Sequence, residues 1–185
     1  MPRGRYLLQP PDGPRLLERF SCGPGPTGWR YAATRTDADT GAPRGRLDLV
    51  LDARGRVLRH EAEAGGWLLR GGAVGDRLLW RRGDDEHEEV AAGFSGTSPA
   101  YAVAAVRLLR PVEPVRARFV QLDDAVLAPL VVEQGWSRTG TLDVGGREVA
   151  RYEVADLGTG ERRVVQLAGD LVLEATGVVL AELEG

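Results

Sequence analysis

The chain contains 185 residues, of which 43% are apolar and 28% are charged, and this composition is typical of one folded domain spanning residues 1–185. Its net charge is −3 and its acidic and basic residues alternate locally, which argues against a nucleic-acid partner. No apolar run approaches the roughly 20 residues that a membrane-spanning helix needs, and the first residues lack the apolar core of a signal peptide, so we expect a cytoplasmic protein without a transmembrane segment.

The first strands are expected after a proline- and glycine-rich N-terminal segment, residues 1–27. Residues 46–64 alternate apolar and polar side chains on both sides of a turn at residues 53–55, which predicts a β-hairpin. The segments GGWLLRGG and DRLLWRR follow, each bounded by turn residues. Both are predicted to be short strands.

Two segments interrupt this pattern. Residues 84–93, DDEHEEVAAG, predict an acidic loop. Further on, Ser98 is a good N-cap residue and Pro99 suits a first helical turn, so we expect a short helix over about residues 99–107, with a buried strand as the alternative. The apolar residues of this segment surround its whole circumference, and a helix here should therefore be buried or lie across the mouth of a sheet.

Alternating runs return in the last third of the chain. The segment TLDVGGREVARYEV predicts a hairpin whose turn is Gly145-Gly146, and further turns are expected at Gly169-Asp170 and near Gly177. We count roughly ten strands with a turn every 8 to 12 residues, which is typical of all-β proteins. The sequence therefore predicts a mainly all-β domain built on a curved antiparallel sheet, with at most one or two short helices.

Catalytic and metal-binding groups are sparse. The two histidines, His60 and His87, lack the spacing of metal ligands, and the single cysteine, Cys22, excludes an internal disulfide. Asp123 and Asp124 are a carboxylate pair, but a loop or a helix cap explains them better than acid-base chemistry, because adjacent strand residues point to opposite faces. We expect no cofactor, no metal and no catalytic residues.

Aromatic residues offer the best candidates for ligand contact. The four tryptophans lie on or beside expected strands, where filling the core is their ordinary role. The alternative is that some of them line an apolar cavity inside a curved sheet, with arginines at its rim. Under this alternative the ligand-binding candidates are Tyr31, Trp67, Trp80, Tyr101, Arg107 and Arg118. Arginine abundance itself carries little weight, because the chain has no lysine, isoleucine or asparagine and is thus consistent with a GC-rich genome.

The order of these motifs resembles the glycolipid-binding family with a spiral β-roll fold. The segments GWRYAATR, RLDLVLDARGRVLRHEAEA and GGWLLRGG come in the family's order, and Ser98-Pro99 followed by Arg107-Leu108 is similar to its connecting segment. The resemblance covers most of residues 28–183. It implies a spiral β-roll or half-barrel whose concave face encloses an apolar cavity, similar in architecture to bacterial lipoprotein carriers.

Three functions remain open from the sequence. The first is a non-enzymatic binding protein for a small apolar or amphiphilic, glycolipid-like ligand, in which Arg107 meets the polar head of the ligand unless it forms a salt bridge instead. The second is a small hydrolase-like enzyme that uses His60 with Glu61 or Glu63. The third is a structural or interaction protein with a filled core. The oligomeric state stays open as well.

Overall fold

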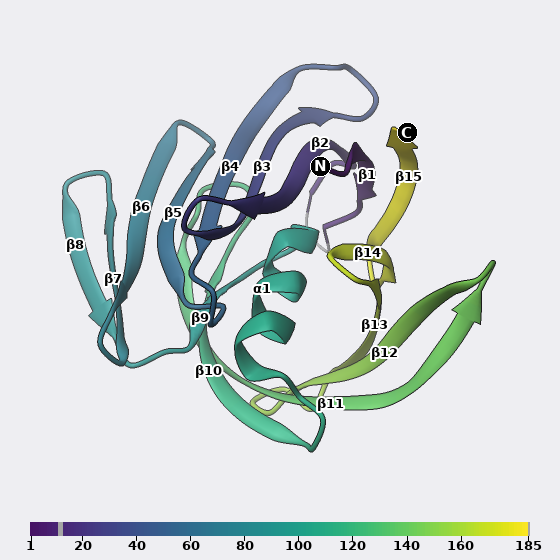
Figure 1. Ribbon diagram of the computed structural model, residues 1–185. Helices are drawn as coiled ribbons and strands as arrows, with labels where there is room; N and C mark the ends of the chain where they lie inside the picture. The colour runs from purple at the N-terminus through teal and green to yellow at the C-terminus, as the bar shows by residue number, and fades with distance from the viewer. Residues whose placement is uncertain (11–12, 185) are drawn as a thin grey trace.

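The computed structural model describes residues 1–10 and 13–184 of the chain, and within them the chain forms one helix and fifteen strands (Figure 1). The helix, α1, spans Pro99–Leu109. The strands are β1 Arg3–Leu8, β2 Leu16–Gly25, β3 Gly28–Asp37, β4 Pro43–Leu51, β5 Val57–Ala64, β6 Trp67–Val74, β7 Arg77–Arg82, β8 Asp85–Glu89, β9 Gly93–Ser95, β10 Val115–Leu122, β11 Pro129–Val144, β12 Arg147–Asp156, β13 Arg162–Ala168, β14 Leu171–Ala175 and β15 Val178–Glu184.

All fifteen strands belong to one open, curved sheet. Its order is β8-β7-β6-β5-β4-β3-β2-β1-β15-β14-β13-β12-β11-β10-β9, so most neighbours in space are also neighbours along the chain. Every pair is antiparallel except β9 and β10, which are parallel and are connected through α1. The first and last strands pair with each other in the interior of the sheet, with Arg3 opposite Glu184. This architecture confirms the predicted all-β class with a curved, mainly antiparallel sheet.

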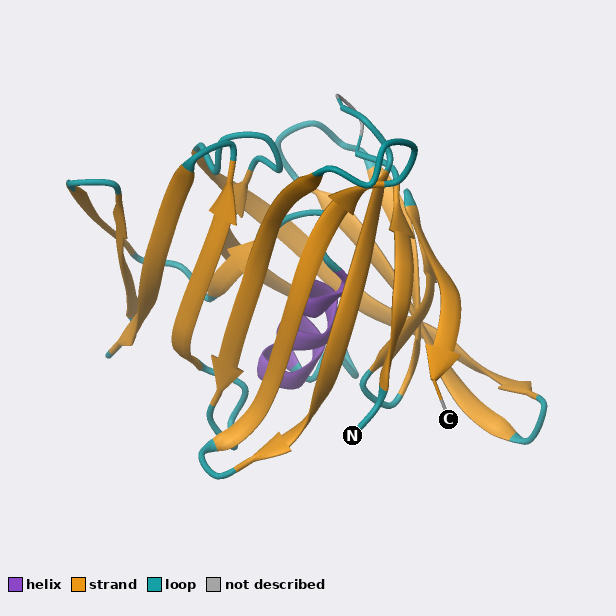
Figure 2. Cartoon of the chain, turned by 90° about the horizontal axis from the view of Figure 1, so that it is seen from above, coloured by secondary structure: helices purple, strands orange, loops and turns teal. Residues whose placement is uncertain are grey.

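Helix α1 lies on the concave side of the sheet, where the strands curve around it (Figures 1 and 2). Its start follows the predicted pattern, because the Ser98 hydroxyl accepts a hydrogen bond from the backbone N–H of Ala100 and Pro99 occupies the first turn. The helix ends where Arg110 adopts a left-handed conformation, with φ of 46°. The predicted helix is confirmed, and it continues two residues beyond the expected end at 107.

The core lies between the helix and the inner face of the sheet. Strand residues at alternating positions point inward, as β3 shows with Trp29, Tyr31 and Ala33 all buried. On the helix, Tyr101, Val103 and Ala104 are buried against them. The apolar circumference of α1 therefore has a direct cause: the helix is enclosed by the sheet instead of lying on the surface.

Several local expectations are confirmed and others are wrong. The hairpins β4–β5 and β11–β12 lie where they were predicted, and the latter turns at Gly145 and Gly146, both with positive φ. Residues 84–93 are not a loop, because Asp85–Glu89 forms the edge strand β8, where charged side chains discourage pairing with another chain. Residues 1–27 contribute β1 and β2 to the sheet, although their prolines and glycines suggested a segment outside it. The expected ten strands are thus too few.

No helix in the described residues has the length and apolar character needed to cross a membrane.

Candidate functional site

The concave interior of the roll is filled by α1. Small spaces lie beside the helix in the described residues, one next to Phe94 and Tyr101 and another next to Leu122 and Leu127, and each of these holds about 10 Å³. A space of this size accommodates about one water molecule. The cavity that the family resemblance implied for the concave face is therefore occupied by the protein's own helix in the described residues.

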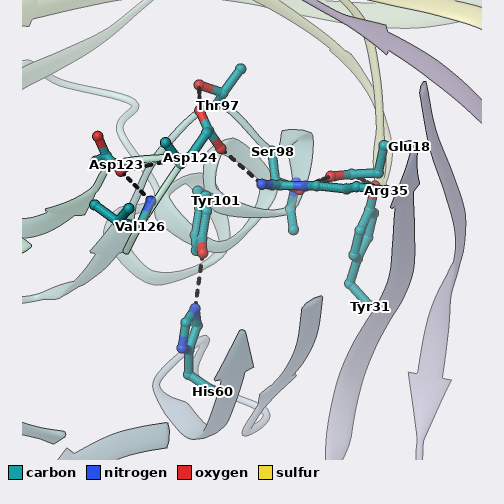
Figure 3. Close-up of polar contacts among 12 residues, drawn as sticks. Glu18, Tyr31, Arg35, His60, Thr97, Ser98, Tyr101, Asp123, Asp124 and Val126 are labelled. Atoms are coloured by element: carbon teal, nitrogen blue, oxygen red, sulfur yellow. Dashed lines mark hydrogen bonds and ion pairs between the residues drawn. The ribbon is translucent and has the colours of Figure 1, made fainter. Parts of the chain in front are cut away.

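A buried ion-pair network lies at the N-terminal end of α1 (Figure 3). The Arg35 guanidinium donates to Glu18 at 2.8 Å and to Asp124 at 2.8 Å, so it bridges two carboxylates. Glu18 also accepts hydrogen bonds from the Tyr31 hydroxyl at 2.6 Å and the Ser98 hydroxyl at 2.8 Å. The network therefore joins β2, β3, the cap of α1 and the loop between β10 and β11.

The electrostatics of this network follow from its burial. Glu18 is fully buried, and Arg35 is 7% exposed. Burial, the charge of Glu18 and the hydrogen bond to Glu18 all raise the pKa of the Tyr31 hydroxyl well above its usual range. Burial alone would lower the pKa of Arg35, but the negative charges of Glu18 and Asp124 outweigh it and keep the guanidinium charged. Arg35 is thus a permanent cation held between two carboxylates.

His60 lies deeper on the inner face of β5. Its Nε2 is 2.9 Å from the Tyr101 hydroxyl, its ring stacks on Phe94, and its Nδ1 has no partner among the described residues. Burial, with the nearby charge of Arg35, lowers the pKa of His60 to about 3, so the imidazole is neutral at ordinary pH.

The proposed pairing of His60 with Glu61 or Glu63 is wrong. Glu61 binds Arg46 and Arg70, and Glu63 binds Arg46, all on the outer face of the sheet. Since successive strand residues point to opposite faces, His60 cannot share a site with these two glutamates. Among the described residues, no three His, Cys, Asp or Glu side chains lie close enough together to hold a metal ion.

The larger opening is a groove of about 810 Å³ at one end of the roll. It lies where β3 ends, where β4 begins and where β5 turns into β6, and the Arg35–Asp124 pair belongs to its lining. Its apolar lining includes Leu16, Trp67 and Leu68. The polar part of the lining also includes Arg44, Arg46, Glu63, Thr34 and Thr36. We call this opening the end groove.

The loop between β10 and β11 is fastened beside the end groove. The Asp123 carboxylate accepts hydrogen bonds from the backbone N–H groups of Ala125 and Val126, which folds the loop into a tight turn. Arg82 donates to the carbonyl of Val126 at 3.1 and 2.9 Å. At Gly65, a Cβ atom would come within 2.1 Å of the Ala125 carbonyl, so this close approach requires glycine.

The six candidate ligand residues do not converge on one cavity. Trp67 is 39% exposed and lines the end groove, with the Arg82 guanidinium 3.6 Å from its ring centroid. The other three aromatic candidates are buried: Tyr31, Trp80 and Tyr101. Tyr31 donates to Glu18, and the Tyr101 hydroxyl lies beside His60. Trp80 packs edge-on against Phe94. The ordinary role of core filling therefore applies to Trp80, and also to Trp29 and Trp136.

The two candidate arginines form ion pairs. Arg107, in the last turn of α1, donates to both carboxylate oxygens of Asp170, at 2.8 and 2.9 Å. This is the salt bridge that was the alternative to a ligand contact. The Arg107 guanidinium group also lies over the ring of Trp29. Arg118, on β10, pairs with Glu89 at 3.1 Å on the exposed surface. Neither residue lines the end groove.

Three important polar residues, Glu18, Arg35 and Asp124, were missed as a group. For Glu18 and Arg35 a signal was present: Glu18 stands between Leu16 and Phe20, and Arg35 between Ala33 and Asp37, at positions where alternation turns the side chain inward. A charged residue at an inward position is costly unless it is paired, so each of them pointed to a buried partner. No local pattern indicated that the partner would come from a loop about ninety residues away.

Comparison with known proteins identifies the fold. A crystal structure of a DUF1089 family protein from Pseudomonas aeruginosa superposes with a TM-score of 0.59 and 19% sequence identity, covering 85% of this chain and 88% of that chain. The two proteins therefore share the curved all-β architecture. No family model matches the sequence, and no curated protein matches it significantly.

Proposed function

We propose that the protein is a non-enzymatic binding protein that holds a small apolar or amphiphilic, glycolipid-like ligand, and that the ligand lies in the end groove. The observation that carries this proposal is an open groove of about 810 Å³, within the size range of small-molecule sites, in a molecule whose interior spaces beside the helix hold about 10 Å³ each. The resemblance of the strand motifs to a glycolipid-binding family supports the same class of ligand.

The lining suits a ligand with two chemically different parts. Leu16, Leu68 and the exposed ring of Trp67 provide apolar contacts for one part. For the polar part of the ligand, Arg35 offers hydrogen-bond donors and the adjacent Asp124 offers acceptors. Because the groove's arginines already have carboxylate partners, its polar end matches hydroxyl groups, which both donate and accept, better than a single negative charge.

The chemistry of the site supports binding over catalysis. A general acid or base needs a pKa near the working pH and access to the substrate. His60 has neither, since it is fully buried and its pKa is lowered to about 3. The Arg35 guanidinium is fixed by hydrogen bonds to two carboxylates, which suits it to position a ligand and not to transfer a proton.

A second function has one observation in its favour. The helix fills the concave face, and a structural or interaction protein needs no more than such a filled core. Ligand binding at the end groove separates the two functions.

The test uses octyl glucoside as an amphiphile with a hydroxyl-rich head and titrates it below its micelle concentration while tryptophan emission is recorded. We expect a saturable change, since Trp67 is the tryptophan that lines the groove. Ala125→Phe adds a bulky ring to the lining of the groove and should weaken binding by about tenfold or more, which corresponds to about 1.4 kcal/mol.

The matched control is Val74→Phe, which places the same ring at a 64% exposed position on β6 away from the groove. It should bind as the wild type does. An absence of saturable binding in the wild type, or equal weakening in both variants, would leave the filled-core structural protein as the better description.

A further inference from the structure

We propose that the outer face of β1–β4 carries a separate binding site for an oxyanion, a phosphate or sulfate group, with Arg3 and Arg19 as its principal ligands. This inference goes beyond the proposed function, because neither arginine lines the end groove. The site is a depression of about 500 Å³ on the convex surface.

The strand register explains why the surface is hollowed here. Arg3 on β1 lies opposite Ser21 on β2, and Ser21 lies opposite Ala32 on β3. One row further along, Thr34 lies between Arg19 and Arg46. Small side chains thus form the floor and arginines rise around them. A depression with this arrangement directs several guanidinium groups toward one volume.

Charge balance distinguishes Arg3 and Arg19 from their neighbours. The other outward arginines of β1–β6 all have a carboxylate within ion-pair distance: Arg5, Arg30, Arg44, Arg46, Arg59 and Arg70. Among the residues that the structure describes, Arg3 and Arg19 form no such pair. Two guanidinium groups therefore line the same depression without an acidic partner in residues 1–10 and 13–184.

Three carboxylates also line the depression, and most of their charge is already engaged. Asp48 is bound by Arg30 and Arg59, and Glu61 is bound by Arg46 and Arg70. Glu184, opposite Arg3 at the end of β15, is the remaining one. Among the described residues that line the depression, two arginines and one carboxylate thus have no ion pair, which leaves a local excess of positive charge on a chain whose net charge is −3.

The chemical class of the ligand follows from these groups. Planar guanidinium groups bind phosphate and sulfate oxygens in pairs of parallel hydrogen bonds, and the Ser21 and Thr34 hydroxyls add donors at the floor. The shared chemistry is a tetrahedral oxyanion, which a free phosphate ester and a phospholipid headgroup both supply.

The experiment compares these two sources. Inorganic phosphate and inorganic sulfate are titrated by calorimetry at low ionic strength, where exposed charges are least screened. In parallel, the protein is sedimented with vesicles of phosphatidylcholine alone or of phosphatidylcholine mixed with phosphatidylglycerol. Saturable binding of the free ions, or sedimentation only with the anionic vesicles, supports the proposal and identifies the source.

Variants assign the site to its residues. Replacing both arginines, Arg3→Gln with Arg19→Gln, should weaken binding by about tenfold or more, the loss expected for charge-assisted hydrogen bonds. Arg19→Lys keeps the charge without the planar fork and should lie between the wild type and the double variant. The control is Arg54→Gln, which removes an exposed arginine from the turn between β4 and β5; Arg54 forms no ion pair with the residues that the structure describes.

The proposal is overturned if neither source binds the wild type, if the double variant binds as tightly as the wild type, or if Arg54→Gln weakens binding as much as the double variant does. Thermal unfolding of each variant, measured alongside, checks that both arginine positions tolerate substitution. Octyl glucoside binding in the double variant should equal that of the wild type, because neither arginine lines the end groove. The oxyanion proposal and the end-groove proposal can therefore fail independently of each other.

Discussion

Each end of helix α1 is joined to the sheet through a carboxylate, but in different surroundings: the cap residue Ser98 donates to Glu18 at the N-terminal end, and Arg107 binds Asp170 at the C-terminal end. At the N-terminal end, Arg35 is buried with Glu18 and Asp124; the Tyr31 and Ser98 hydroxyls donate to the second oxygen of Glu18, and the Thr97 hydroxyl donates to the second oxygen of Asp124. At the C-terminal end, the side chains of Arg107 and Asp170 are 36% and 28% exposed.

The comparison shows that similar contacts have different energetic consequences. Solvent screens the Arg107 pair, and such pairs typically contribute about 0 to 1 kcal/mol. Removing one member of the buried network instead leaves a charge without its partner, which costs about 3 to 5 kcal/mol. Breaking the N-terminal network should therefore cost more stability than breaking the C-terminal pair.

The largest expected effect follows from breaking the buried network. Arg35→Met leaves Glu18 charged and buried without its cation, and should lower the free energy of unfolding by about 3 to 5 kcal/mol in urea titrations. The double variant Arg35→Met with Glu18→Gln should recover part of that loss, because only the part-buried Asp124 carboxylate then remains without its cation. Equal stability of the Arg35→Met variant and the wild type would show that the buried ion pairs of Arg35 do not stabilise the fold.

The second largest effect is a dependence of stability on pH, which comes from His60 beside the N-terminal half of α1. Because the pKa of His60 is about 3 when folded, below its ordinary value near 6.5, the unfolded chain binds a proton over this range that the folded chain does not. His60 should therefore make no pH-dependent contribution to the free energy of unfolding above about pH 6.5. Below about pH 6.5, its contribution should lower the free energy of unfolding by about 1.4 kcal/mol for each pH unit.

His60→Phe tests this effect, because phenylalanine does not titrate. Between about pH 7 and about pH 5, the variant should lose about 2 kcal/mol less stability than the wild type. The same loss in both proteins would mean that His60 is not held neutral by burial.

A smaller effect is expected from Tyr101→Phe. This change removes the hydrogen bond with His60 Nε2 and leaves that buried nitrogen without a partner, at a cost of about 1 to 2 kcal/mol. Unfolding in urea measures it, and the slope with denaturant should not change. If His60→Phe and Tyr101→Phe are combined, their effects should be less than additive, since the two side chains share one bond.

The smallest effect belongs to Arg107→Ala, which should destabilise the protein by about 0.5 to 1 kcal/mol. High salt should reduce the difference from the wild type. Because Arg107 lies outside the end groove, octyl glucoside binding should stay the same in this variant. A selective loss of binding with unchanged stability would restore Arg107 as a ligand residue.

Local features of the fold were predictable because local physics sets them. The cap at Ser98, the proline after it and the Gly145-Gly146 turn each act over a few residues, and the structure has all three. The edge strand β8 was missed because acidic residues are rare in strands. At the edge of a sheet, however, charged side chains are favourable because they discourage pairing with another chain. The end groove and the Arg35–Asp124 contact depend on loops that meet only after folding.

The pairing of β1 with β15 has a consequence for how the chain folds. Most strands pair with a neighbour along the chain, but this contact joins its two ends, with Arg3 opposite Glu184. Such a distant contact has the greatest loop-closure entropy to overcome, so the two halves of the sheet should form first and meet at this seam last. A circular permutant that joins the ends and opens the Gly145-Gly146 turn would make the seam a local hairpin and reverse that order.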